Sequence, residues 1–154
     1  MIESDPMIQL KSIGTVHNAI HAAHRNTRWQ DIESEIEIEA QWREALDGLE
    51  QFSHIWVVTY LDRIPAPESL RIHPKPADEA VRVGIFATRA PQRPNPIGIC
   101  AVELLQVRGN TLRVRGLDAL DRTPVLDLKP YLARRDAIPN TRVGGWISQS
   151  EERK

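Results

Sequence analysis

The chain has a single cysteine and no glycine-rich phosphate loop, and each absence removes a class of protein. Cys100 cannot form an intrachain disulfide, so a disulfide-stapled secreted domain is excluded and a reducing compartment is favoured. None of the eight glycines forms G-x-G-x-x-G or G-x-x-x-x-G-K, the patterns that bring backbone close to phosphates. No G-x-S-x-G elbow is present either, which disfavours hydrolysis by covalent attack.

Long apolar runs are also missing. The longest one, around residues 55–61, is too short to cross a bilayer. Residues 1–11 contain polar side chains and Pro6 where a signal peptide needs an apolar block. With 154 residues, 41% hydrophobic and 27% charged, the composition is that of one ordinary globular domain. We therefore expect a cytoplasmic protein with a single domain over residues 1–154, its core spanning about 8–147 between short flexible termini.

Charge is unevenly distributed along the chain. Residues 1–80 carry 7 Lys and Arg against 14 Asp and Glu, whereas residues 81–154 carry 13 against 7. This asymmetry indicates either an anionic partner for the second half, or acidic and basic surfaces that meet within the fold or across a dimer.

The spacing of apolar residues predicts mostly strands. An opening strand is expected near residues 10–16, and Ile36 and Ile38 alternate with glutamates as in a half-buried strand. Residues 41–49 have the spacing of a short helix that Gly48 would end. Residues 53–61 are apolar almost throughout, which predicts a strand covered on both faces.

The second half continues this pattern. Strands are expected at residues 81–85 and 97–107, with a phase slip at Leu104-Leu105 that a bulge would explain. Gly109-Asn110 is a two-residue hairpin signal, and residues 112–115 and 125–128 read as further strands. These five or six strands and one short helix predict an all-β fold, an antiparallel sheet closed or nearly closed into a barrel.

Prolines stiffen the loop that follows the strand at residues 81–85. Pro91, Pro94 and Pro96 restrict the backbone of Arg93 and Asn95, so these polar side chains are aimed before a ligand arrives. A second proline-rich stretch, residues 64–78, lacks periodicity and is long enough to be a functional flap.

Three histidines and three aspartates are candidate functional groups. His17, His21 and His24 have the spacing of a metal-binding helix face, but a His-rich surface loop explains them as well, and we expect no metal. Asp118 and Asp121 could bind ribose hydroxyls, bind a cation or accept a proton, and turn formation is the alternative for both. Asp127 faces either solvent or a polar pocket.

Four sequence blocks resemble the TrmO family, also called TsaA-like or YaeB-like proteins. They are G-I-F-A-T-R at residues 84–89, R-P-N-P-I-G at 93–98, T-P-V-L-D-L-K-P-Y at 123–131 and L-E-Q-F-S-H-I-W at 49–56. The resemblance spans about residues 8–147. It implies a single-sheeted, TsaA-like antiparallel barrel, usually dimeric, that uses S-adenosyl-L-methionine to methylate the exocyclic N6 nitrogen of N6-threonylcarbamoyladenosine beside the anticodon of tRNA.

The resemblance also implies a set of cofactor-binding residues. Those that match the family's positions are Arg89, Ile99, Leu117, Asp118, Ala119, Leu120, Leu61 and Asp62, joined by a looser match at Arg28, Trp29 and Gln30. Arg89 offers a planar donor fork suited to a carboxylate, and Asp118 suits ribose or amine groups. We expect the stiffened loop to face the Asp118 segment and form one socket.

The acceptor and the catalytic base are less determined. Asp118, Asp121 and Asp127 are the candidate bases, none of them singled out by the residues. Many bacterial relatives carry a further domain that helps to hold tRNA, so here RNA contact would come from the barrel. Candidates for the substrate or RNA face are Arg93, Asn95, Arg113, Arg115, Lys129 and Tyr131, with Arg108, Arg122, Arg134, Arg135 and Arg142 as further phosphate contacts or ordinary surface charge. A small amine acceptor, or cofactor binding without turnover, remains an alternative.

Overall fold

The computed structural model describes residues 7–24, 26–74 and 81–147. The chain forms two compact units. The barrel unit comprises Met1–Tyr60 and Gly98–Tyr131, and the second unit comprises Leu61–Ile97 and Leu132–Lys154. Each unit is described by itself.

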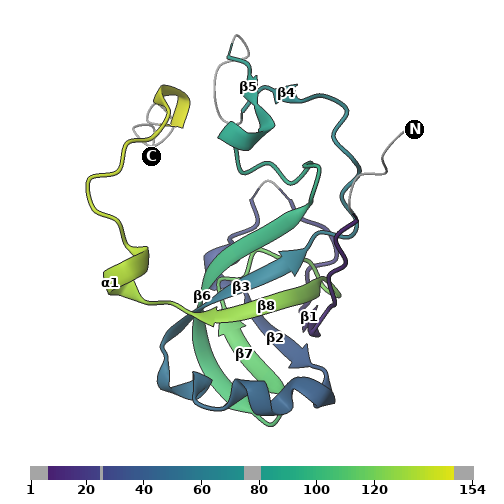
Figure 1. Cartoon of the computed structure of the whole chain (residues 1–154), viewed down its shortest axis with the longest axis vertical. Helices are drawn as coiled ribbons and strands as arrows, with labels where there is room; N and C mark the ends of the chain where they lie inside the picture. The colour runs from purple at the N-terminus through teal and green to yellow at the C-terminus, as the bar shows by residue number, and fades with distance from the viewer. Residues whose placement is uncertain (1–6, 25, 75–80, 148–154) are drawn as a thin grey trace. The chain divides into compact units, whose positions relative to one another are not determined.

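Six antiparallel strands close into a barrel in the order β1-β2-β7-β6-β3-β8, as Figure 1 shows. This confirms the predicted all-β class and barrel architecture. The barrel strands are β1 (Gly14–His17), β2 (Glu33–Ile38), β3 (His54–Tyr60), β6 (Ile97–Arg108), β7 (Thr111–Arg115) and β8 (Pro124–Pro130).

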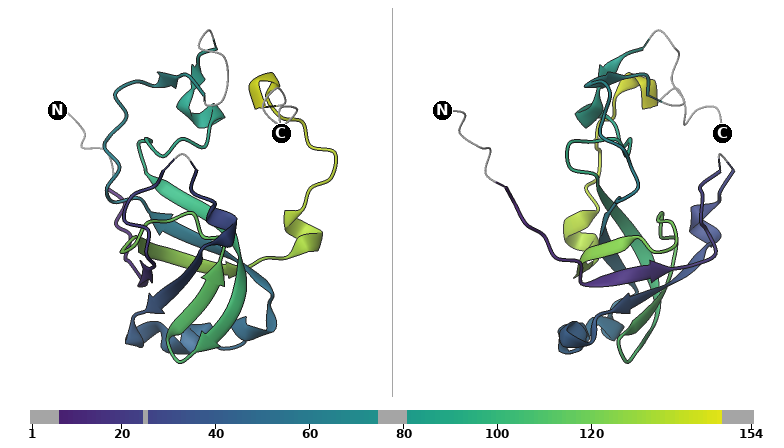
Figure 2. Two further views of the ribbon diagram at one scale, coloured as in Figure 1. Left: turned by 180° about the vertical axis from the view of Figure 1, so that it is seen from behind. Right: turned by 90° about the vertical axis from the view of Figure 1, so that its right-hand side faces the viewer.

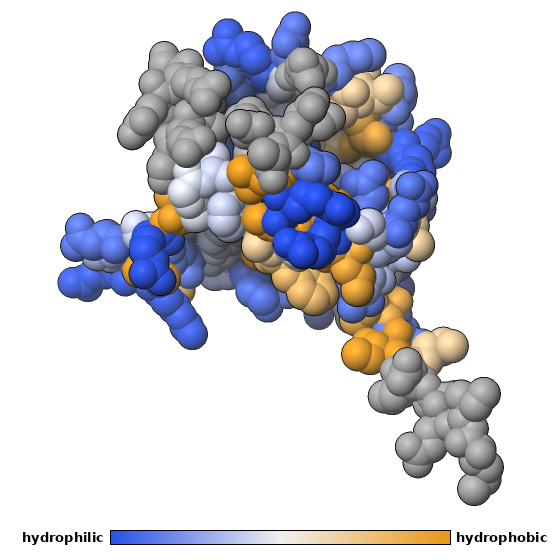
Figure 3. Space-filling model, turned by 90° about the horizontal axis from the view of Figure 1, so that it is seen from above, coloured by the Kyte–Doolittle hydropathy of each residue, from blue (hydrophilic) through white to orange (hydrophobic). Residues whose placement is uncertain are grey.

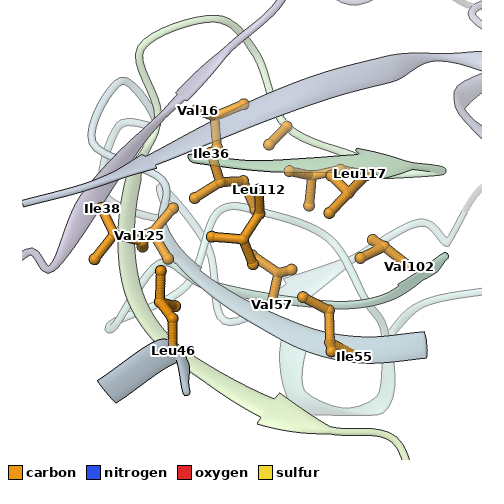
Figure 4. Close-up of a cluster of buried hydrophobic side chains, with 12 residues drawn as sticks. Val16, Ile36, Ile38, Leu46, Ile55, Val57, Val102, Leu112, Leu117 and Val125 are labelled. Carbon is orange, nitrogen blue, oxygen red and sulfur yellow. The ribbon is translucent and has the colours of Figure 1, made fainter. Parts of the chain in front are cut away.

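The core lies inside the barrel and is almost purely aliphatic. Alternate residues of β2 are buried and exposed, so Ile36 and Ile38 point inward while the intervening glutamates face outward, as predicted. Ile36 meets Leu112 of β7 in register, and side chains from all six strands converge around them (Figure 4). Burial of these side chains supplies the main driving force for closing the sheet.

The β6–β7 hairpin has the two features that the sequence predicted. The strand register shifts between Leu104 and Gln106, which is the expected bulge. The turn is Gly109-Asn110, with Gly109 at a φ of 62° that favours glycine. The Asn110 side-chain amide donates to the carbonyl oxygen of Ile38 at 2.6 Å, which ties the turn to β2.

Two short 3₁₀ helices, η2 and η3, lie at the same end of the barrel as this hairpin (Figures 1 and 2). The predicted helix at residues 41–49 is η2 (Ala40–Leu46), and Gly48, with a φ of 86°, separates it from η3 (Leu49–Gln51). A further turn, η1 (Trp29–Asp31), precedes β2 at the other end. Leu46 of η2 packs into the barrel core.

One strand differs from its predicted environment. Residues of β3 alternate between buried positions such as Ile55 and Val57 and half-buried positions such as Trp56 and Val58. The expectation of cover on both faces was wrong, because the closed sheet buries the inner face of β3 and leaves its outer face half-buried or exposed.

The second unit has little regular structure. A two-stranded sheet pairs β4 (Arg71–Ile72) with β5 (Val83–Gly84), and η4 (Ile85–Ala87) and α1 (Ala133–Asp136) are single turns. Of the strand predicted at residues 81–85, only Val83–Gly84 forms, and Ile85 begins η4. The strand is short because its partner, β4, has only two residues. After it, the Thr88 hydroxyl donates to the Ile85 carbonyl at 2.8 Å and closes a turn.

This small sheet also corrects the expectation of one sheet for the chain. The predicted flap at residues 64–78 contributes β4, and its last residues, 75–78, lie outside the described part.

Figure 3 shows a face on which hydrophilic residues predominate, with hydrophobic ones between them. No helix among the described residues has the length and apolar character needed to cross a membrane.

Candidate functional site

The predicted cofactor segment forms a corner between β7 and β8. We call residues 116–123 the 116–123 corner; it follows β7, at the barrel end opposite the β6–β7 hairpin. Gly116, at a φ of 91°, begins the turn, and its amide donates to the Ile32 carbonyl at 3.0 Å. Leu117 and Ala119 are buried, whereas Asp118 between them is exposed. The corner thus anchors two apolar side chains in the core and presents Asp118 outward.

Asn18, directly after β1, holds this corner in place. Its side-chain amide nitrogen donates to the Ser34 hydroxyl and to the Ala119 carbonyl, both at 3.0 Å. Its backbone amide donates to Oδ1 of Asp121 at 3.1 Å, and its own Oδ1 accepts from the Ile20 amide. One side chain therefore joins the β1–β2 loop, β2 and the corner. Sequence reasoning missed Asn18, because an asparagine after a strand is also ordinary loop chemistry.

Asp121 is an anchored carboxylate. The hydrogen bond from the Asn18 amide lowers the pKa of Asp121, and the neighbouring His21, Arg122 and His17 side chains act in the same direction. Oδ2 lies 3.5 Å from Nδ1 of His21 and 3.8 Å from Nε of Arg122. A carboxylate with a lowered pKa is a weaker base, and its hydrogen bond to the loop is the turn chemistry that the sequence also allowed.

We expect the free energy of unfolding to fall at acidic pH, as Asp121 becomes protonated and its hydrogen bond to Asn18 weakens. Because the pKa of Asp121 is lower in the folded state, its contribution is complete above the unfolded value, near 3.8, and is lost as the pH falls through the folded value. Urea unfolding of wild type and Asp121→Asn between pH 6 and 3 tests this. The variant should lose less stability on acidification than wild type. Equal losses would show that the carboxylate does not stabilise the corner as an anion.

The third candidate base, Asp127, lies elsewhere on the barrel. It belongs to β8, where Oδ2 is 2.7 Å from Nζ of Lys129 and Oδ1 accepts from the Leu128 amide. It lines a cavity of about 420 Å³ beside η2 and η3, whose lining is mostly apolar rather than the polar pocket that the sequence offered as one alternative. Asp118 and Asp121 therefore share one corner, and Asp127 does not join them.

The side chains of His17 and His21 have separate partners. Nε2 of His17 lies 3.3 Å from a carboxylate oxygen of Glu37, and His21 contacts Asp121. Within the part of the chain that the structure describes, no group of three or more His, Cys, Asp or Glu side chains could hold a metal ion.

The basic outer face of β7 is matched by acidic neighbours. Arg115 bridges Glu33 at 2.7 Å and Glu103 at 2.9 Å, and Arg113 lies 3.3 Å from Glu33. The hydrogen bond from Arg115 lowers the pKa of Glu33 and raises that of Arg115. Along β2 and β7, the acidic first half and the basic second half of the chain thus meet within the barrel, one of the alternatives that the charge distribution allowed.

Tyr131, a predicted substrate contact, stands in an aromatic group. Its ring centroid lies 5.5 Å from that of Trp56 and 6.4 Å from that of His54. Ile99, on β6, is 52% exposed. Of the residues that match the family only loosely, Arg28 precedes η1, and Trp29 and Gln30 lie within it. Nε of Arg28 lies 2.9 Å from Oδ2 of Asp31.

In the second unit, Arg93 restrains the proline loop from within. One guanidinium nitrogen donates to the carbonyls of Thr88 at 2.9 Å and Ala90 at 3.1 Å, and the guanidinium lies 5.8 Å from the ring centre of Phe86. The sequence predicted a stiff loop from its prolines alone, and Arg93 adds a polar restraint that it did not foresee. Arg89 in the same loop is exposed.

The other predicted residues of this unit lie close to the same loop. The Leu61 amide donates to the Pro96 carbonyl at 2.8 Å. Oδ1 of Asp62 lies 3.7 Å from Nε of Arg63. The side chain of Asn95 is exposed. Arg89, Leu61 and Asp62 thus belong to one unit and the 116–123 corner to the other, so the predicted single socket stays a prediction.

Comparison with known proteins decides the family. The model of the tRNA-methyltransferase O N-terminal domain matches residues 13–137, which include the corner, the proline loop and all six barrel strands. The chain belongs to the TrmO family.

Proteins similar to this chain carry different descriptions. A protein of Methanothermobacter thermautotrophicus described as a probable S-adenosyl-L-methionine-binding protein is 44% identical, over 88% of this chain and 98% of its own length. A mouse protein described as a tRNA (adenine(37)-N6)-methyltransferase is 38% identical, over 64% of this chain and 23% of its own length.

A solved structure of TrmO from Pseudomonas aeruginosa has the same architecture. It superposes with a TM-score of 0.74 at 30% identity, over 91% of this chain. The chain spans 63% of the length of that TrmO protein, so it matches the archaeal relative nearly end to end and the TrmO structure only in part.

Proposed function

We propose that this chain is an S-adenosylmethionine-dependent methyltransferase that acts on the exocyclic N6 nitrogen of N6-threonylcarbamoyladenosine in tRNA. The observation that carries the proposal is the family match over residues 13–137, which covers both segments that present candidate ligand groups. The mouse relative, described as acting on adenine 37 of tRNA, supports the acceptor.

Two exposed side chains suit the polar groups of the cofactor. S-adenosylmethionine carries a carboxylate, an ammonium group and ribose hydroxyls. Arg89 is exposed and offers the planar donor fork that binds a carboxylate through two hydrogen bonds, and exposed Asp118 offers acceptors for hydroxyl or ammonium hydrogens. We propose these two side chains as the polar cofactor contacts of their respective units.

The proposed reaction requires positioning more than covalent chemistry. When bound, the cofactor supplies a methyl group on a sulfonium centre, whose transfer forms a nitrogen–carbon bond, breaks the carbon–sulfur bond and leaves a neutral thioether. The acceptor nitrogen releases one proton, for which Asp118, exposed among the cofactor-matching residues of the corner, is our candidate. The 116–123 corner, held by the hydrogen bonds of Asn18, gives Asp118 a fixed position for a reaction that depends on placement.

Transfer of labelled methyl groups tests the proposal. The protein is incubated with methyl-labelled S-adenosylmethionine and total tRNA from a host that lacks this methylase, with tRNA from the methylating host as the matched control. We expect label in the unmodified tRNA, on nucleosides that contain threonylcarbamoyladenosine, and little in the control. Absence of label from every tRNA would contradict the proposal.

A second candidate is cofactor binding without turnover. It is favoured by the archaeal relative of nearly equal length, which is described only as binding S-adenosylmethionine. Calorimetric binding of the cofactor together with no label transfer, to tRNA or to small amines, would support this candidate over the first.

A further inference from the structure

Arg122, in the 116–123 corner, has a backbone conformation that disfavours its side chain. Its φ is 64°, in the left-handed region. Among the described residues other than glycine, only Asn140 shares a positive φ, and asparagine tolerates this region far better than a long side chain does. The conformation of Arg122 is thus a local strain that a glycine would relieve.

The fold imposes this conformation through the backbone. The Arg122 amide donates to the Val16 carbonyl at 2.7 Å, and the amides on either side, of Asp121 and Thr123, donate to the carbonyls of Ile20 and Leu120. Thr123 is also buried, with 3% of its surface exposed. None of these hydrogen bonds uses the arginine side chain, so the stability of the corner does not account for an arginine here.

The side chain faces solvent and is only loosely balanced by acidic groups. It is 82% exposed, and its Nε lies 3.8 Å from Oδ2 of Asp121, beyond hydrogen-bonding distance. That carboxylate also receives the Asn18 amide and contacts His21, which is 77% exposed. By contrast, the arginines of β7 lie 2.7 to 3.3 Å from glutamate oxygens. The edge of the corner therefore presents the Arg122 guanidinium to solvent, close in sequence to Asp118.

We propose that Arg122 binds a backbone phosphate of the RNA substrate at the edge of the 116–123 corner. Residues in strained backbone conformations cluster at binding and catalytic sites, and an exposed guanidinium on a hydrogen-bonded backbone is suited to a phosphate. This inference rests on the proposed function and assigns one of the chain's many arginines to RNA contact. Arg113 and Arg115, which pair with glutamates, are not needed for it.

The test compares Arg122→Gly, Arg122→Ala and Arg122→Lys with wild type. The matched control is Arg43→Ala, which removes an exposed arginine from η2 at the opposite barrel end. Affinity for unmodified tRNA is measured between 50 and 200 mM salt, in the presence of S-adenosylmethionine. Cofactor affinity and the melting temperature are measured on the same proteins.

We expect Arg122→Gly and Arg122→Ala to bind tRNA roughly 5- to 10-fold more weakly at low salt, with a log K against log salt slope shallower by about 0.7 to 0.9, the loss of one phosphate contact. Arg122→Lys should keep the slope, Arg43→Ala should match wild type, and cofactor affinity should be unchanged. Arg122→Gly should also melt higher than wild type, because the strain is relieved.

Three other results would contradict the role of Arg122. Wild-type binding and slope in both Arg122→Gly and Arg122→Ala would overturn the role of Arg122 and leave the proposed function standing. Loss of cofactor affinity in these variants would also overturn it, since Arg122 would then act through the cofactor. No salt-dependent affinity of the wild-type protein for tRNA would overturn the proposed function together with this inference.

Discussion

Arg89→Ala is expected to weaken S-adenosylmethionine binding by about 1.5 to 3 kcal/mol, or roughly 10- to 150-fold in Kd, while the fold stays intact. The size is that of hydrogen bonds to a charged group, which the alanine variant loses. Arg89 is exposed in the loop that matches the family, so its truncation leaves no cavity in the core. Isothermal titration calorimetry measures the effect directly, and circular dichroism checks the fold.

Two further variants make this measurement specific. Arg89→Lys keeps the charge but loses the planar fork, so it should recover only part of the affinity. Arg82→Ala removes another exposed arginine of the same unit, whose guanidinium donates to the Arg71 carbonyl at 3.3 Å, and should bind the cofactor as wild type does. Wild-type affinity in a folded Arg89→Ala protein would show that the family match does not extend to this position.

Gly14→Ala is expected to destabilise the barrel by about 3 kcal/mol, the upper range for forcing atoms into a packed site. A Cβ at Gly14 would overlap the carbonyl oxygen of Glu37 and lie 3.0 Å from the Cα of Ile38. Both are backbone atoms of β2, which pairs with β1 at this point and cannot move without disturbing the ladder. Urea unfolding of the variant gives the change in free energy.

Gly84→Ala is the matched control for this prediction. A Cβ at Gly84 has the Leu70 carbonyl oxygen, at 3.9 Å, as its nearest neighbour, which is ordinary contact. Its effect on the free energy of unfolding should stay within about 0.5 kcal/mol. If Gly14→Ala is as mild as Gly84→Ala, β1 and β2 do not approach as closely as the structure indicates.

Local sequence patterns predicted most of the barrel. The alternation of Ile36 and Ile38 with glutamates, the phase slip at Leu104-Leu105 and the Gly109-Asn110 turn each depend on a few adjacent residues. Such features need no knowledge of distant neighbours. The predicted strand at Ile85 failed because a strand also needs a partner, and β4 offers two residues.

The candidate site was predictable only in part, because its contacts join segments distant in sequence. Asp121 was recognised as a corner residue, but its partner Asn18 lies 103 positions away. Likewise, the alternation along residues 112–115 indicated a basic face, and only the pairing of β7 with β2 revealed the glutamates beside it.

The sequence by itself determined the family, the β class and the inward and outward faces of β2 and β7, since these follow from short-range patterns and from block similarity. Tertiary structure alone decided which polar groups pair and which backbone is strained. The left-handed conformation of Arg122 shows why: it results from hydrogen bonds to β1, more than a hundred residues earlier in the chain. Backbone hydrogen bonds between distant segments leave no trace in the identity of the residues that make them.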